Sequence, residues 1–417
     1  MLKKLWFCLL LAAIFAFVPL AHASADSGRY FVKSTKGFWK NALGVRHEFD
    51  NGFSADLSDF QVRFAKIFGV DIEPVSVLQI QSSESLASQS DSLSASIIGA
   101  TASPTPTPPP QLKILKKGTT NRFIPSDQTP WGIQVIYNDP LVASTSGGDN
   151  VNVAVLDTGV DVLHSDLSGR IAQCKDFTNP RSPLLADKCD DKNGHGTHVA
   201  GIIAADSGSD HLGLYGVAPS AKIFAYKVCG TDGSCYADDV AAALRLAADQ
   251  GANVINMSFG TNEDIQLVHD AINYAVSKGA LLVAGVGNDG PFPDSIDYPA
   301  AYASVIGVGA INQSLNVTDW SSRGTNSQTT PYVVKDGDVE FAAPGEYIES
   351  TWNNGGYAIL SGTSMASPFV AGLAAKYWQS DAENPAQSTR DFLHSLAYDL
   401  FPPGYDNMSG FGLPQVR

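Results

Sequence analysis

From about residue 123 onward, short apolar runs alternate with segments of helical spacing. Runs typical of buried strands occupy 151–156, 222–228, 254–258 and 280–286, and helical spacing is found over 199–205, 237–250, 264–278 and 363–378. Gly251 and Gly279 close two of the helical segments, as glycine often does. Strands that alternate with helices predict an α/β domain, with a mostly parallel sheet and helices on both faces.

A smaller α/β unit is predicted before this domain. An amphipathic helix is expected over 58–68, where Phe60 and Phe64 share a face. Ser58 is its candidate N-cap, because a serine side chain can accept a hydrogen bond from a free backbone N–H of the first turn. Strand-like segments of this unit occupy 29–33, 45–49 and 75–80.

The first residues have the pattern of a secretory signal peptide. Lys3 and Lys4 precede an apolar run over 5–20, and small residues at 21–25 offer a cleavage site. A membrane anchor is the alternative, but the run is somewhat short for a span. We therefore expect 1–23 to be removed and the mature protein to be secreted, either extracellular or periplasmic, with no membrane segment.

Composition separates the two folded units. Residues 82–111 are rich in Ser, Ala, Thr and Pro and end in closely spaced prolines, so they lack the large apolar groups needed for a core. The predicted organisation is an N-terminal unit over 24–81, a linker over 82–121 and the larger domain over 122–417.

Charge and cysteine content narrow the class. The net charge of −15 predicts an acidic surface that repels phosphate backbones, so nucleic acid is not an expected partner. Of five cysteines, Cys8 lies in the apolar leader, and the remaining even number suggests two disulfides in an exported protein. Three pairings are possible. We favour Cys174–Cys189 and Cys229–Cys235, because each pair flanks a polar loop.

Three segments carry candidate chemistry: Val-Leu-Asp-Thr-Gly with Asp157, Asn-Gly-His-Gly-Thr-His with His195, and Gly-Thr-Ser-Met-Ala-Ser-Pro with Ser364. Each alone has another interpretation. Asp-Thr-Gly also occurs in aspartic proteases, which need two facing carboxylates. His195 and His198 resemble a metal pair but lack the glutamate of zincins. A serine at a helix start is usually a cap.

Together the three segments fit one mechanism. A serine hydroxyl is a weak nucleophile and needs an adjacent base. Histidine suits that role because its pKa lies near neutrality, and a carboxylate orients the imidazole and stabilises its charged form. The order Asp157, His195, Ser364 is the order found in subtilisin. Gly-Thr-Ser-Met-Ala does not match the Gly-x-Ser-x-Gly elbow of an α/β-hydrolase esterase.

On these motifs the chain resembles the subtilase family from about residue 130 to near its C-terminus. The resemblance implies a serine endopeptidase, in which Asp157 orients the base, His195 is the base, Ser364 is the nucleophile and Asn288 completes the oxyanion hole. Polypeptide substrates are the implied partners, and we expect a monomer. An inactive subtilase-like binding protein is the alternative, but such proteins usually lose a member of the triad.

The resemblance also implies a substrate cleft. Substrate is expected to bind as an added β-strand. The residues expected on one edge of the cleft are Ser258, Phe259 and Gly260. The residues expected to line an apolar pocket, before the scissile bond, are Ala284, Gly285 and Val286. Phe369 stands where the family commonly has histidine, at a packing position.

A structural calcium ion is implied by the same resemblance. Carboxylates and carbonyls are the ligands that this hard cation prefers. The expected carboxylates are Asp127, Asp166 and Asp210, and the expected carbonyls are those of Gly208, Leu212 and Leu214. Solvated surface acids are the alternative interpretation of these aspartates.

The N-terminal unit resembles the inhibitor-type propeptide of subtilases, in particular at 29–33 and 47–55. This implies that the unit assists folding and then blocks the cleft as an intramolecular inhibitor. Because the linker is long, the maturation site is expected near Ile80 or anywhere up to about Arg122.

Overall fold

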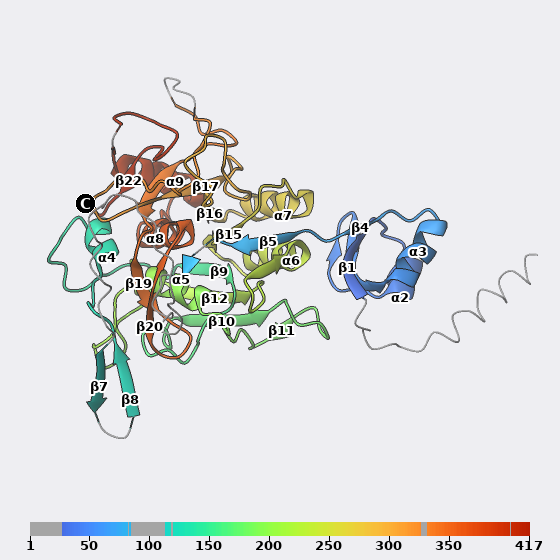
Figure 1. Ribbon diagram of the computed structural model, residues 1–417, viewed down its shortest axis with the longest axis horizontal. Helices are drawn as coiled ribbons and strands as arrows, with labels where there is room; N and C mark the ends of the chain where they lie inside the picture. Colours follow the sequence, from blue (N-terminus) through green and yellow to red (C-terminus); the bar gives the residue numbers. More distant parts are fainter. Residues whose placement is uncertain (1–26, 82, 85–112, 118–119, 327–331, 401) are drawn as a thin grey trace, which may run out of the picture. The chain divides into compact units, whose positions relative to one another are not determined.

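The computed structural model describes residues 27–81, 83–84, 113–117, 120–326, 332–400 and 402–417 (Figure 1). The predicted signal peptide and most of the predicted linker lie outside the described residues. The chain divides into two compact units, Met1–Val75 and Ser76–Arg417, and each is described by itself. None of the helices in these ranges has the length and apolar character needed to cross a bilayer.

The first unit is a four-stranded antiparallel sheet in the order β2–β3–β1–β4, with two helices. The predicted cap is confirmed, because the Ser58 hydroxyl accepts from the N–H of Gln61 and the Gln61 side chain accepts from the N–H of Ser58. The helix buries Val62 and Ala65, packs Phe64 partly against the same core and leaves Phe60 exposed. Its elements are β1 (Ser27–Val32), α2 (Gly37–Leu43), β2 (Glu48–Phe49), β3 (Gly52–Ser58), α3 (Asp59–Ile67) and β4 (Ile72–Pro74).

The second unit is built on an eight-stranded sheet in the order β11–β10–β12–β9–β14–β16–β17–β18. Only the β10–β11 pair of this sheet is antiparallel, which confirms the predicted fold class. The central strands are buried on both faces, so their sequences are nearly continuous apolar runs. The strands are β9 (Asn152–Asp157), β10 (Ile171–Asp176), β11 (Leu185–Ala186), β12 (Lys222–Lys227), β14 (Val254–Met257), β16 (Leu281–Gly285), β17 (Val305–Ile311) and β18 (Phe341–Pro344).

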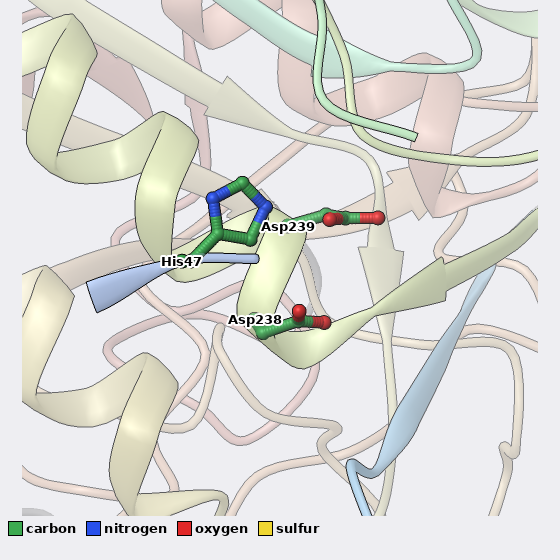
Figure 2. A group of neighbouring side chains, drawn as sticks. All are labelled: His47, Asp238 and Asp239. Carbon is green, nitrogen blue, oxygen red and sulfur yellow. The ribbon is translucent and has the colours of Figure 1, made fainter. Parts of the chain in front are cut away.

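Helices cover this sheet in two pairs, with α5 packed against α8 and α6 packed against α7 (Figure 1). Asp238 and Asp239 lie in the first turn of α6, where negative charge is favourable at a helix N-terminus (Figure 2). The helices are α4 (Trp131–Ile136), α5 (His195–Ala204), α6 (Ala237–Asp249), α7 (Gln266–Ser277), α8 (Thr363–Lys376) and α9 (Pro385–Leu396).

Short sheets complete the second unit. The expected strand at 75–80 forms as β5, but it pairs with β13 and β15 of the second unit instead of ending the first. The further pairings are β19 with β20, β20 with β6, β21 with β22, and β7 with β8. The bounds are β5 (Val77–Ile80), β6 (Ser83–Glu84), β7 (Lys113–Lys117), β8 (Thr120–Ile124), β13 (Ser234–Tyr236), β15 (Phe259–Gly260), β19 (Ile348–Thr351), β20 (Tyr357–Ser361), β21 (Ala397–Tyr398) and β22 (Leu413–Pro414).

Phe369 packs inside this unit, as expected for its position in the family. Its side chain is 1% exposed, and a Cβ placed on Gly132 of α4 would lie 2.5 Å from its ring. Glycine at position 132 therefore lets α4 approach α8 closely enough to cover the ring.

We predict that Phe369→Ala lowers the free energy of unfolding by about 3–5 kcal/mol, because it leaves a cavity in a packed core. The control is Phe292→Ala, which removes a ring that is 69% exposed and should change stability by less than about 0.5 kcal/mol. Urea unfolding of both variants, each also carrying Ser364→Ala to remove the expected peptidase activity, makes the comparison. Equal effects would show that Phe369 contributes no core packing.

Candidate active site

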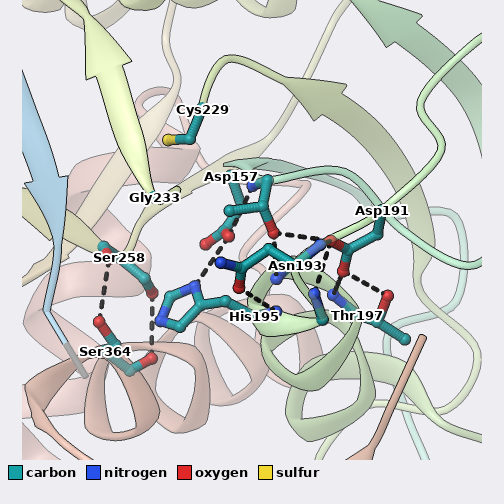
Figure 3. Close-up of polar contacts among 12 residues, drawn as sticks. Asp157, Asp191, Asn193, His195, Thr197, Cys229, Gly233, Ser258 and Ser364 are labelled. Atoms are coloured by element: carbon teal, nitrogen blue, oxygen red, sulfur yellow. Dashed lines mark hydrogen bonds and ion pairs between the residues drawn. The ribbon is translucent and has the colours of Figure 1, made fainter. Parts of the chain in front are cut away.

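The carboxyl end of β9 meets the start of α5. Asp157 is the last residue of β9, His195 is the first of α5, and both side chains are buried. Nδ1 of His195 lies 2.8 Å from Oδ1 of Asp157 (Figure 3). The carboxylate therefore favours the tautomer with its proton on Nδ1 and leaves Nε2 as an acceptor. Among the described residues Nε2 has no hydrogen-bond partner, so it is free to take a proton from a neighbouring group.

Asp191 holds the start of α5 against the segment that follows Asp157. Its Oδ1 accepts from the Thr158 hydroxyl at 2.9 Å and from the N–H of Gly194 at 2.8 Å. Its Oδ2 accepts from the N–H and hydroxyl of Thr197 at 2.9 and 2.6 Å (Figure 3). Sequence reasoning missed this residue. The sequence feature that could have identified Asp191 is its position just before a helix capped by a glycine, which has no side chain to accept from the free N–H groups of the first turn.

Ser364 is the second residue of α8 and is buried. Its hydroxyl donates to the carbonyl of Ser258 at 2.9 Å and accepts from the N–H of Gln81 at 3.0 Å. The three predicted residues are thus brought to one site, without a hydrogen bond between Ser364 and His195 (Figure 3). Hydrogen bonds between a nucleophile and its base often form only when substrate is bound. Here the Ser364 hydroxyl must turn away from its present partners to reach Nε2 of His195.

Pro368 removes one hydrogen bond from the first turn of α8. Proline has no N–H to donate to the carbonyl four residues earlier, which belongs to Ser364. The hydroxyl of Ser258 donates to that carbonyl at 3.0 Å and lies 3.1 Å from the hydroxyl of Ser367. Ser258, predicted as a cleft residue, therefore also stabilises the turn that carries Ser364.

Asn288 follows β16 and directs its amide to the same place. Its Nδ2 donates to the carbonyl oxygen of Gln81 at 2.9 Å, and the N–H of Ser364 donates to that oxygen at 3.3 Å. Oδ1 of Asn288 accepts from the N–H and hydroxyl of Thr363 at 3.0 and 3.2 Å, which determines the end of the amide that faces Gln81. Two donors on one carbonyl oxygen are suited to stabilise the negative oxygen of a tetrahedral intermediate.

The chain's own residues 77–81 run through this site as an added strand. β5 lies antiparallel between β13 and β15, with Leu78 opposite Cys235 and Gln79 opposite Gly260. The N–H of Gln81 also bonds the carbonyl of Ser258 at 3.3 Å. The expected edge at 258–260 therefore pairs with an extended segment. Sequence reasoning missed the opposite edge, β13.

The side chain of Gln81 enters a narrow pocket between two glycines. A Cβ on Gly260 would lie 2.2 Å from Nε2 of Gln81, and a Cβ on Gly285 would lie 3.0 Å from Oε1. Nε2 donates to Oδ2 of Asp297 at 2.8 Å. The expectation of an apolar pocket is therefore wrong, because a carboxylate lies at its inner end.

The alternation of side chains along a strand explains part of this error. Ala284 and Val286 flank Gly285, so their side chains point to the opposite face, and both are fully buried. Of the three residues predicted to line the pocket, Gly285 faces Gln81. Asp297 comes from a loop beyond the strand, and no motif around it signals a contact with the pocket.

His198 has a structural role beneath the site. Its Nε2 lies 3.0 Å from the carbonyl of Ile348 and 3.1 Å from that of Ala358. Burial, followed by the proximity of His195, lowers the pKa of His198 to about 3, so the ring is neutral. Nε2 of His198 faces these carbonyls and Nδ1 of His195 faces Asp157, so hydrogen bonding accounts for the position of both rings.

The segments of the expected calcium site lie next to one another. The side chain of Gln128 donates to the carbonyls of His211 and Gly213 at 2.7 and 3.0 Å, and the N–H of Leu214 donates to Asp166 at 3.0 Å. Within the described part of the chain, the carboxylate oxygens of the three predicted aspartates do not all lie within 4.8 Å of one another. The backbone thus brings together the loop at 208–214 and the segments of Asp127 and Asp166, but not a three-carboxylate cluster.

Both favoured disulfides are present. Cys174 pairs with Cys189, and Cys229 pairs with Cys235. The second disulfide closes the loop that leads into β13, so it covalently restrains one edge of the cleft.

The sequence order aspartate, histidine, serine on an α/β fold distinguishes subtilisin-like serine peptidases from other serine peptidases. The fold and the site of this chain therefore define it as a subtilisin-like serine peptidase. Comparison with known families agrees, because residues 148–412 match the Subtilase family. The chain belongs to this family.

Individual relatives extend the comparison. Subtilisin of Bacillus sp. (strain TA39) is 46% identical over 317 residues, which are 71% of this chain and 74% of that protein. Minor extracellular protease Epr of Bacillus subtilis (strain 168) is 31% identical over 400 residues, which are 96% of this chain and 55% of that protein. The solved structure of Sphericase, 46% identical, has a TM-score of 0.68 and covers 70% of this chain and 99% of its own. The match to Epr thus includes the N-terminal unit.

We predict that Asn288→Ala lowers kcat by roughly 10²–10³ with little change in KM, because the lost donor acts on charge that develops in the transition state. This range is the one known for the oxyanion-hole asparagine of subtilisin itself. Steady-state kinetics on a peptide substrate measure both constants. A variant that loses only substrate affinity would show that Asn288 acts on the ground state.

Proposed function

We propose that this chain is a secreted serine endopeptidase made as a zymogen that cleaves itself after Gln81. The observation that carries the proposal is the position of Gln81, whose carbonyl oxygen accepts hydrogen bonds from both Asn288 and the backbone of Ser364. The name of the relative Epr, an extracellular protease, supports secretion.

In the proposed mechanism Ser364 attacks the carbonyl carbon of the peptide and transfers its proton to Nε2 of His195. Asp157 stabilises the resulting imidazolium through the hydrogen bond to Nδ1. The negative oxygen is held by Asn288 and the N–H of Ser364. His195 then protonates the leaving amine, and water hydrolyses the acyl-enzyme in a second cycle of the same steps.

Strand pairing on both sides of Gln81 supports cleavage at this bond. Before it, β5 pairs with β13 and β15, and after it β6 pairs antiparallel with β20. A peptide bond held at both ends by main-chain hydrogen bonds resembles a bound substrate. The same pairing supports the role of the N-terminal region as an intramolecular inhibitor, since other polypeptides need the edges that β5 occupies.

We predict that the purified precursor releases an N-terminal fragment ending at Gln81, and that Ser364→Ala remains uncut because it lacks the nucleophile. Intact-mass measurement of both proteins over time gives the result. A fragment ending elsewhere would refute cleavage after Gln81. Efficient maturation of pure Ser364→Ala would refute self-processing.

An inactive binding protein is the competing function, and a serine-directed fluorophosphonate separates the two. Mature protein should be labelled at Ser364, and Ser364→Ala should not react. Absence of label from mature wild-type protein would favour the binding protein.

We also propose a structural calcium ion at the loop 208–214. The proposed ligands are the carboxylates of Asp127, Asp166 and Asp210 and the carbonyls of Gly208, Leu212 and Leu214, which are the hard oxygens that calcium prefers. Binding would require the three carboxylates to move together, because they do not form a cluster in this structure. The hydrogen bonds from Gln128 to this loop support the proposal, because they bring the segment of Asp127 against it. Such an ion would stabilise the fold and take no part in the reaction.

We predict that chelation lowers the melting temperature of the mature enzyme while the initial rate barely changes. An ion that binds only the native state stabilises it by about 2.7 kcal/mol at a hundredfold excess over Kd. Asp210→Ala should reduce the response to calcium, and the control Asp381→Ala, which removes another exposed carboxylate, should not. Superimposable melting curves with calcium and with chelator would exclude the site.

A further inference from the structure

We propose that Asp297 selects substrates whose residue before the scissile bond carries a side-chain N–H donor at the reach of glutamine. The inference rests on the proposed peptidase function and deepens it by naming a substrate class. It starts from Gln81, whose Nε2 donates to Oδ2 of Asp297 at 2.8 Å at the inner end of the pocket.

Gln81 is the hydrogen-bond partner of the Asp297 carboxylate. Asp297 is 9% exposed, and within the described residues its carboxylate accepts a hydrogen bond from Gln81. Its backbone is fixed separately, because its N–H donates to Val286 and its carbonyl accepts from Ala301. The main chain of Asp297 is thus fixed independently of Gln81, and the residue before the scissile bond supplies the partner of its carboxylate.

Burial raises the pKa of Asp297 to about 6, the amide of Gln81 opposes this rise, and the nearby charge of Asp289 adds to it. In mildly alkaline solution the group is therefore ionised and can only accept hydrogen bonds. An apolar side chain in the pocket would leave a largely buried charge without a partner, which is strongly unfavourable.

The size and charge of the side chain before the scissile bond then determine which substrates are favoured. The pocket is narrow, since Cβ atoms on Gly260 and Gly285 would lie 2.2 and 3.0 Å from the amide of Gln81. Glutamate has the shape of glutamine but would place a second negative charge against Asp297. Methionine has similar length and no donor. Lysine carries a donor one bond farther from Cα, so its ammonium reaches the carboxylate only with a bent side chain.

The test uses the mature enzyme and peptides that differ only in the residue before the scissile bond. In mildly alkaline buffer we expect kcat/KM for glutamine to exceed that for methionine by roughly 10–100-fold, as expected when a buried polar group is left unpaired. Glutamate should be disfavoured by more than about 100-fold. Lysine should be cut faster than methionine. Equal rates for glutamine, methionine and glutamate would overturn the proposal.

Substitution of Asp297 provides a second test of the proposed substrate preference. Asp297→Asn keeps the shape and adds a donor, so it should reduce the preference for glutamine over glutamate by at least about tenfold. The control Asp294→Asn removes an exposed charge three residues away and should leave the preference unchanged. An unchanged preference in Asp297→Asn would show that Asp297 does not select the substrate.

Self-cleavage of the precursor tests the same preference, with residue 81 as the residue before the scissile bond. Gln81→Glu should slow self-cleavage, and combining it with Asp297→Asn should restore the rate, which a merely structural role of Asp297 would not produce. Lack of rescue would count against the proposal. Fluorophosphonate labelling separates this failure from failure of the proposed function: an enzyme that is labelled but unselective refutes only the role of Asp297, whereas an enzyme that neither cuts nor reacts refutes the peptidase assignment.

Discussion

The buried hydrogen bond between Asp157 and His195 is the contact on which the rest of the site depends. A buried carboxylate is tolerated only with close partners. Oδ1 of Asp157 has two, the N–H of Thr158 at 2.7 Å and the imidazole at 2.8 Å, whereas Oδ2 has no hydrogen-bond partner among the described residues. The two residues are 38 positions apart, so the strand and the helix that carry them must be held together. Asp191 holds them, because its carboxylate bonds both Thr158 and the first turn of α5. Nε2 of His195 faces the site only while this arrangement persists.

The second constraint is that a polypeptide must enter as a strand. The main-chain hydrogen bonds along β13 and β15 do not depend on the sequence of the bound segment. The pocket formed by Gly260, Gly285 and Asp297 contacts one side chain, that of the residue before the scissile bond. In the proposed zymogen the chain uses both features on itself. The residue that fills the pocket in the precursor is then also a guide to the substrates of the mature enzyme, because cleavage of either requires the same contacts.

Local patterns predicted much of the framework. The apolar runs at 151–156 and 254–258 became buried parallel strands, Ser58 became an N-cap, and both disulfide pairings formed. The failures share a cause. The strand at 75–80 was expected to complete the first unit but joined the second, because strand propensity does not specify a partner. The pocket that was expected to be apolar contains the carboxylate of Asp297, because a loop beyond the strand contributes to it.

The sequence by itself determined the family, the order of the three reactive residues and the likeness of Asn288 to an oxyanion-hole donor, because each of these residues lies in a short motif that adjacent residues are enough to identify. Only the tertiary structure decided that Gln81 lies at Ser364 and that Asp297 closes the pocket. These contacts join positions 283 and 216 residues apart, respectively. No local pattern encodes such a pairing, since it results from where separate strands and loops of the folded sheet end.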